Sequence, residues 1–146
     1  MSVPPVRQPP WPDATSLPRL CRPDGRPWLA LLADDNAINR EVGVALLEQL
    51  GLQVDTAEDG AEVLHKTGQA HYDLVLMDLQ MPRLDGLSAT RGLRSRPGLR
   101  QLPVIALTAN STDDSRRDCM AAGMNDFISK PIDIHLLAET LSRWLR

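Results

Sequence analysis

Five short apolar runs alternate with segments of helical periodicity, and this alternation constrains the fold more than any other feature of the sequence. The runs cover residues 28–33, 52–57, 73–78, 103–108 and 125–129, and a helix-compatible stretch follows each of them. Strands that alternate with helices form parallel sheets joined by right-handed crossovers. The runs LVLM and VIAL show no polar alternation, which is typical of strands buried on both faces. We therefore expect a doubly wound α/β domain with a five-stranded parallel sheet and helices on both faces.

The helices between these runs have recognisable faces and ends. In the first helix a predicted apolar stripe stops at Gly51; it consists of Ile38, Val42, Ala45, Leu46 and Leu50. The second helix is predicted to start at Asp59, with Glu62 at the spacing of a capping box. The last helix carries leucines at i, i+4 and i+8 beside Trp144, namely Leu137, Leu141 and Leu145.

Composition separates an N-terminal tail from the domain. Residues 1–27 hold eight of the 12 prolines, which fix φ and remove backbone donors, and they carry four Arg against two Asp, a charge of +2. We interpret this segment as a Pro-rich linker or disordered tail, with a spacer favoured over a proline-recognition ligand, and residues 28–146 as one domain. That domain carries 12 basic and 17 acidic side chains, a charge of −5. An acidic domain with few aromatic residues is unsuited to binding nucleic acid.

Cysteine content and hydropathy indicate the compartment. Two cysteines, Cys21 and Cys119, are too few for a disulfide framework or a zinc site, so we expect reduced thiols. No apolar run approaches the roughly 20 residues of a membrane span, and the first residues lack the apolar core of a signal peptide. We therefore expect a cytoplasmic chain without membrane insertion.

Polar side chains follow the apolar runs where each predicted strand ends. Asp34 and Asp35 follow the first run, Asp78 ends the third, Thr108 ends the fourth and Lys130 follows the fifth. Ligands bind beyond the carboxyl ends of the strands in open α/β sheets, so these groups should meet at one edge. The glycine patterns of nucleotide-binding loops are missing from the sequence.

Oxygen ligands with several negative charges favour Mg²⁺, which binds one or two carboxylates and keeps further oxygen ligands. A carboxylate beside such an ion is a suitable nucleophile toward a phosphoryl group. A cation, an ammonium group and a hydroxyl donor stabilise the charge that develops during that transfer. We therefore expect Asp34 and Asp35 to hold the metal next to Asp78.

Four segments at these strand ends resemble the receiver domains of two-component response regulators. They are LLADDN, VLMDLQMPRLDG, VIALTAN and FISKPID, in that order, and the resemblance covers residues 28–146. It implies a flavodoxin-like strand order of 2-1-3-4-5. The segments MDLQMPRLDG and LTAN are most similar to receivers attached to hybrid histidine kinases, which implies as an alternative that the chain is the cytosolic part of a membrane-bound kinase.

The resemblance also implies roles for individual residues. Asp78 would accept the phosphoryl group, and the metal, Mg²⁺ with Mn²⁺ as a substitute, would be held by Asp34, Asp35, Asp78 and the backbone carbonyl of Gln80. The phosphoryl group would contact Thr108, the backbone of Ala109 and Lys130. Thr108 and Phe127 would form the switch, and the Lys130–Pro131 bond would be cis. Gln80 and Asn110 occupy positions that tune hydrolysis in the family.

Each residue also has a purely structural interpretation. Asp34 could cap the first helix, although Asn36 is equally suited, and Asp85 with Gly86 fits a turn and helix start. Thr108 alone fits a β-branched strand residue, Lys130 a solvated charge and Phe127 a core side chain. The four methionines at 77, 81, 120 and 124 are expected to pack in the core.

We expect a phosphoacceptor module of His-Asp phosphorelay signalling that catalyses its own phosphoryl transfer and its own dephosphorylation. The three histidines, His65, His71 and His135, are expected near the surface, so the donor would be an external histidine kinase or histidine phosphotransfer protein. Because the chain ends in its fifth helix, we expect no DNA-binding output domain and a downstream protein partner. The alternatives are a degenerate receiver that only binds partners and a Mg²⁺-dependent aspartyl-phosphate phosphatase, whose Asp-x-Asp pattern the segment after the first strand does not match.

Overall fold

A computed structural model describes residues 20–109 and 112–145. Its strands and helices alternate along the chain: β1 Leu29–Ala33, α1 Ala37–Gln49, β2 Gln53–Ala57, α2 Gly60–Gln69, β3 Leu74–Asp78, α3 Gly86–Arg94, the 3₁₀ turn η2 Pro97–Leu99, β4 Val104–Thr108, α4 Asp113–Ala122, β5 Asp126–Ser129 and α5 Ile134–Trp144. The five strands are parallel and lie in the order β2-β1-β3-β4-β5. The doubly wound fold class and the strand order expected from the sequence are therefore confirmed.

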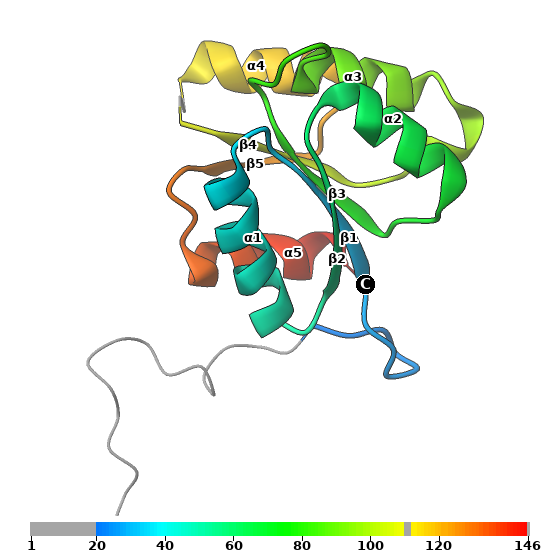
Figure 1. Ribbon diagram of the computed structural model, residues 1–146, viewed down its shortest axis with the longest axis vertical. Helices are drawn as coiled ribbons and strands as arrows, with labels where there is room; N and C mark the ends of the chain where they lie inside the picture. The colour runs from blue at the N-terminus through cyan, green and yellow to red at the C-terminus, as the bar shows by residue number, and fades with distance from the viewer. Residues whose placement is uncertain (1–19, 110–111, 146) are drawn as a thin grey trace, which may run out of the picture.

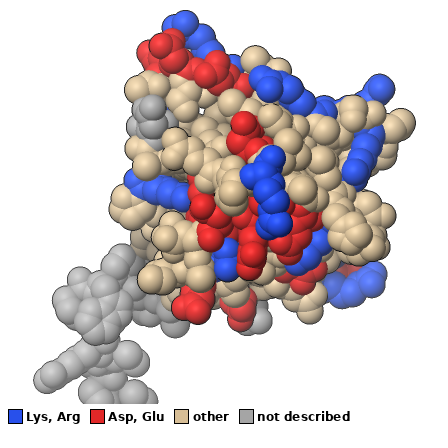
Figure 2. Space-filling model, turned by 45° about the horizontal axis from the view of Figure 1, so that its top comes forward, with Lys and Arg blue, Asp and Glu red and all other residues tan. Residues whose placement is uncertain are grey.

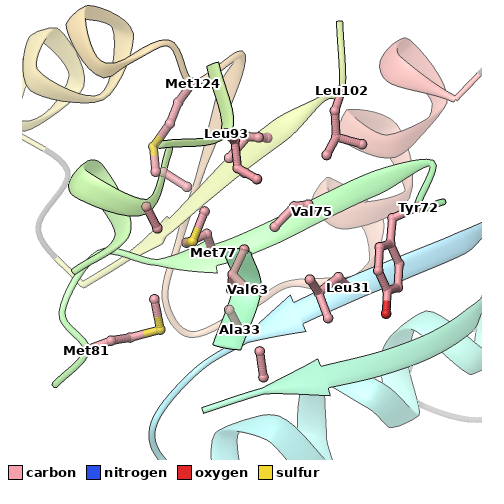
Figure 3. Packing of buried hydrophobic residues seen from close by; sticks show 14 of the residues in the cluster. Leu31, Ala33, Val63, Tyr72, Val75, Met77, Met81, Leu93, Leu102 and Met124 are labelled. Carbon is pink, nitrogen blue, oxygen red and sulfur yellow. The ribbon is translucent and has the colours of Figure 1, made fainter. Parts of the chain in front are cut away.

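Helices cover both faces of the sheet, with α1 and α5 on one face and α2, α3 and α4 on the other (Figure 1). Alternate residues of each central strand point to opposite faces, so the sheet builds two separate cores. Leu31, Val75 and Met77 pack with Val63 of α2 and Leu93 of α3 in one of them (Figure 3). The other core joins the opposite face of the strands to α1 and α5.

The first helix is rotated from its predicted orientation. Ile38 and Val42 were expected in the apolar stripe, yet they are 71% and 51% exposed, whereas Gly43 and Leu47 are buried. Gly43 packs against the sheet: a Cβ there would lie 2.6 Å from Cδ2 of Leu32, so a larger residue would force that side chain to shift. The predicted stripe was therefore wrong at Ile38, Val42 and Ala45, which are exposed, and correct at Leu50, which is buried.

The helix ends follow the sequence closely. Asn36 caps α1 by accepting hydrogen bonds from Ile38 N and Asn39 N, and Asp59 caps α2 by accepting one from Glu62 N. Glu62 reaches back to Glu58 N instead of Asp59 N, so the second half of the capping box is displaced by one residue.

Other packing predictions had mixed outcomes. Asp85 caps α3, as its turn pattern predicted. The three leucines predicted for the last helix are buried, namely Leu137, Leu141 and Leu145, whereas Leu136 of α5 is 59% exposed. Met77, Met81 and Met124 are buried, whereas Met120 is 60% exposed and its predicted packing was wrong.

Residues 20–27, assigned to the tail by composition, contact the edge of the sheet where the strands begin. Leu20 N donates to Leu50 O, and Arg22 lies 2.6 Å from the Asp73 carboxylate and 4.9 Å from the centroid of the Trp28 ring. Residues 1–19 lie outside the described residues. Within the described part, every helix is too short or too polar to cross a membrane.

Candidate phosphorylation and metal site

The carboxyl ends of four strands bring the predicted side chains to one edge of the sheet. Asp34 follows β1, Asp78 ends β3, Thr108 ends β4 and Lys130 follows β5. The parallel register places Asp78 opposite Leu107 and Thr108 opposite Ser129, so these ends are level with one another. The Lys130–Pro131 peptide bond is cis.

Three carboxylates meet at this edge. Asp34, Asp35 and Asp78 each offer an oxygen atom, and these three oxygens lie within 4.8 Å of one another. Asp34 and Asp78 are buried and Asp35 is exposed, as their positions on opposite faces of the strand end require. Three converging carboxylate oxygens fit a hard divalent cation such as Mg²⁺. Figure 2 shows acidic side chains gathered in the middle of one face, with basic side chains among them.

Lys130 neutralises part of this negative charge. Its Nζ lies 2.9 Å from Oδ2 of Asp34 and 3.1 Å from Oδ2 of Asp78. Burial lowers the pKa of Lys130, but the hydrogen bonds to both carboxylates outweigh it and the pKa is raised. Burial raises the pKa of Asp78, and the nearby Asp34 charge adds to that, against the opposing effect of Gln80 N and Lys130. Desolvation therefore dominates at Asp78 even though it has a cationic partner.

An open cavity of about 330 Å³ gives access to this cluster from solvent. The predicted site residues that line it are Asp35, Asp78, Gln80, Thr108, Ala109 and Lys130. Gln80 N donates to Oδ1 of Asp78, which ties the loop after β3 to the predicted phosphoacceptor. Asn110, named for its position two residues after Thr108, lies outside the described residues.

The predicted switch pair occupies adjacent strands. Thr108 is 6% exposed at the end of β4. Phe127 is half-buried on the adjacent strand β5, opposite Ala106. The guanidinium of Arg116, on α4, lies 4.9 Å from the centroid of the Phe127 ring, within cation–π range. Arg116 could not be predicted from the sequence, because nothing in its local pattern links it to a strand residue.

Two further arginines support the site without having been predicted. Arg40 Nη1 donates to the backbone carbonyl of Asp34 over 2.7 Å, and Arg40 also pairs with Glu58 at 3.5 Å. Arg83, in the loop after β3, pairs with Asp59 at 2.5 Å. These contacts join segments that are distant in the sequence, so only the folded chain reveals them.

Comparison with known proteins gives this arrangement a context. Residues 30–142 match the family model of the response regulator receiver domain. Histidine kinase 5 of Arabidopsis thaliana is 39% identical over 142 residues, which cover 79% of this chain and 15% of that protein. The matched segments of the curated relatives span between 5% and 16% of those proteins' lengths.

Solved structures agree with this assignment. The receiver domain of the sensor histidine kinase PA1611 from Pseudomonas aeruginosa, crystallised with a magnesium ion coordinated in its active-site cleft, is 40% identical with a TM-score of 0.77, covering 82% of this chain and 98% of that one. The receiver domain of Ssk1 from Saccharomyces cerevisiae, solved in complex with the histidine phosphotransfer protein Ypd1, is 25% identical with a TM-score of 0.76, covering 82% of this chain and 89% of the matched one. The chain therefore belongs to the response regulator receiver domain family and is a receiver domain of two-component phosphorelay signalling.

Proposed function

We propose that Asp78 accepts a phosphoryl group from a phosphohistidine on a partner protein. The observation that carries this proposal is the convergence of the Asp78 carboxylate, two further carboxylates and the Lys130 ammonium on one solvent-accessible cavity. A carboxylate oxygen of Asp78 forms a bond to phosphorus while the bond from phosphorus to the imidazole nitrogen breaks. The imidazole nitrogen keeps the electron pair of that bond, and the donor leaves as neutral imidazole because its other ring nitrogen carries a proton.

The other residues would stabilise this transfer. Asp34, Asp35, Asp78 and the carbonyl of Gln80 would hold Mg²⁺, which supplies positive charge to the phosphoryl oxygens when it is bound. The Lys130 ammonium would move from the carboxylates to contact a phosphoryl oxygen. The Thr108 hydroxyl would donate a hydrogen bond to the phosphoryl group.

The phosphodonor would approach over the face that carries the exposed end of α1. Ile38 and Val42 are exposed there, and Val42 lines a second cavity of about 250 Å³ with Pro131 and Ile132. This cavity also reaches Asp34 and Lys130, so an apolar surface adjoins the charged site. We propose a histidine kinase or a histidine phosphotransfer protein as this donor, the latter supported by the Ypd1 complex of a related receiver. All three histidines of this chain are exposed, as predicted. A cytoplasmic location stays a prediction.

Incubation with phosphoramidate and Mg²⁺ tests the proposal. The parent protein should gain one base-labile phosphoryl group, detected by intact mass, and Asp78→Asn should abolish it. Asp85→Asn is the matched control, since it changes an exposed acid in the same loop and keeps a side chain suited to capping α3. A phosphoryl group that persists in Asp78→Asn would move the acceptor elsewhere, and a parent protein that is never phosphorylated would favour the degenerate receiver.

We further propose that phosphorylation acts through Thr108 and Phe127. Movement of the Thr108 hydroxyl toward the phosphoryl group would free space for the ring, and the ring would then leave the Arg116 guanidinium. Beryllofluoride, a phosphoryl mimic, should shift amide NMR signals in β5 more than in α2, and Thr108→Ala should reduce that difference. Equal shifts in both elements would argue against this switch.

A further inference from the structure

The loop after β3, residues 79–85, carries the Gln80 carbonyl and is fastened to the start of α2 at two points. Leu84 O accepts a hydrogen bond from Gly60 N over 2.9 Å, and Arg83 Nη2 lies 2.5 Å from Oδ2 of Asp59. The side chain of Asp59 is only 3% exposed, although it belongs to a surface turn. A buried carboxylate needs a cationic partner, and Arg83 supplies it.

Arg83 has an uncommon backbone conformation at this position. Its φ is 66°, in the left-handed region that favours glycine over residues with a side chain. Gly60, which follows Asp59, is constrained in a different way, because a Cβ on Gly60 would collide with the carbonyl of Leu84. A conformation that costs free energy persists where surrounding contacts hold it, and such positions cluster at functional sites.

We infer that the Asp59–Arg83 ion pair is a positioning device for the metal site. The pair holds residues 79–85, and with them Gln80, at the cavity that Asp35 and Asp78 also line. Both residues act through Gln80 and neither lines the cavity. The inference rests on the proposed function, because it requires that Gln80 and the carboxylates bind Mg²⁺.

The geometry also separates positioning from a simple effect of charge. Removing the negative charge of Asp59 weakens attraction for a cation at a distance, whereas removing the positive charge of Arg83 strengthens it. A field effect therefore moves Mg²⁺ affinity in opposite directions in the two variants. Loss of positioning weakens Mg²⁺ binding in both.

The experiment measures the Mg²⁺ dissociation constant of the unphosphorylated protein by isothermal titration calorimetry at constant ionic strength. Asp59→Asn keeps a side chain that can cap α2 and removes the ion pair. Arg83→Ala removes the pair from the other side. We expect both variants to raise the dissociation constant about tenfold, at the low end of what outer-shell partners of metal ligands contribute. Arg117→Ala is the control, because Arg117 forms an exposed pair with Asp114 on α4 and should leave the constant unchanged.

Melting in EDTA provides the second readout. A purely structural role would lower the metal-free Tm of both variants and leave the dissociation constant unchanged, which overturns the inference. Opposite shifts of the constant in Asp59→Asn and Arg83→Ala would also overturn it in favour of a field effect. Failure of the proposed function would be seen in the parent protein itself, which would bind no Mg²⁺ and gain no phosphoryl group.

Discussion

Replacement of Lys130 by Met tests whether this side chain stands in for a metal ion. The substitution keeps an unbranched apolar stem and removes the ammonium that lies 2.9 Å from Asp34 and 3.1 Å from Asp78. At an effective dielectric constant of about 20, each contact is worth roughly 5 kcal/mol of attraction before desolvation is subtracted. Breaking a buried pair costs about 3–5 kcal/mol net, and because Lys130 is 21% exposed we expect the lower end, about 3 kcal/mol.

In EDTA, Lys130→Met should therefore lower the Tm by about 10 °C, from roughly 3–4 °C per kcal/mol for a domain of this size. Saturating Mg²⁺ should shrink the Tm deficit of the variant relative to the parent protein, because the ion relieves the carboxylate repulsion that Lys130 relieves in the parent and should bind the variant more tightly; a hundredfold excess over Kd contributes about 2.7 kcal/mol. Differential scanning calorimetry with and without Mg²⁺ measures both numbers. Lys66→Met is the control, since Lys66 pairs with Glu62 on α2. The decrease in Tm that this substitution causes should be the same with and without Mg²⁺.

The pH dependence of the same variant has a defined sign. The pKa of Asp78 is already raised by burial and by Asp34, and loss of Lys130 raises it further. The folded state then binds more protons than the unfolded state, so stability falls as the pH rises from about 3.8 through the folded pKa. The deficit of Lys130→Met in EDTA should therefore shrink in acid. A Tm deficit that is the same with Mg²⁺, without Mg²⁺ and at low pH would refute the idea that Lys130 compensates the carboxylates.

Three further substitutions have expected outcomes. Burial and the hydrogen bond to Asp55 raise the pKa of Tyr72 to about 12. The parent protein should therefore lose stability as the pH rises from 10 toward 12, because the unfolded state releases the tyrosine proton first. Urea titrations should show that Tyr72→Phe removes this loss. Gly60→Ala should destabilise the fold, because its Cβ would clash with the backbone carbonyl of Leu84. Gly68→Ala, in the same helix, should stabilise the fold by about 0.5–1 kcal/mol, because its Cβ would meet only Nη1 of Arg96 at 3.5 Å, an ordinary contact distance; equal effects would contradict this. Leu47→Ala, at a fully buried position of α1, should cost about 2–5 kcal/mol in chemical denaturation, and a loss below 1 kcal/mol would mean that this side of α1 is not packed.

Much of the fold and of the site could be predicted because both depend on local patterns. Buried parallel strands appear as apolar runs, and the last residue of each run identifies the functional edge of the sheet. Asp34, Asp78 and Thr108 were found in this way, and each lies within one residue of the end of its strand. Capping residues are equally local, which is why Asn36 and Asp85 were identified.

The remaining features depend on contacts between distant segments. The face that α1 buries is decided by the close approach of Gly43 to Leu32, and neither residue alone reveals it. The left-handed conformation of Arg83 was invisible because the usual signal for it is glycine or asparagine. Arg116 was missed for the same reason as the Asp59–Arg83 pair: a long cationic side chain reaches many positions, and only the fold selects one.

The anchorage of residues 20–27 has a mechanical consequence for the domain. Arg22 forms an ion pair with Asp73, one residue before β3, and Asp78 is the last residue of the same strand, at the opposite edge of the sheet. Five steps of about 3.3 Å separate Asp73 from Asp78, a span of roughly 16 Å, and β3 is paired on both sides and buried throughout. A protein that binds residues 20–27 and a protein that recognises Asp78, the proposed phosphoacceptor, would therefore contact opposite edges of the sheet.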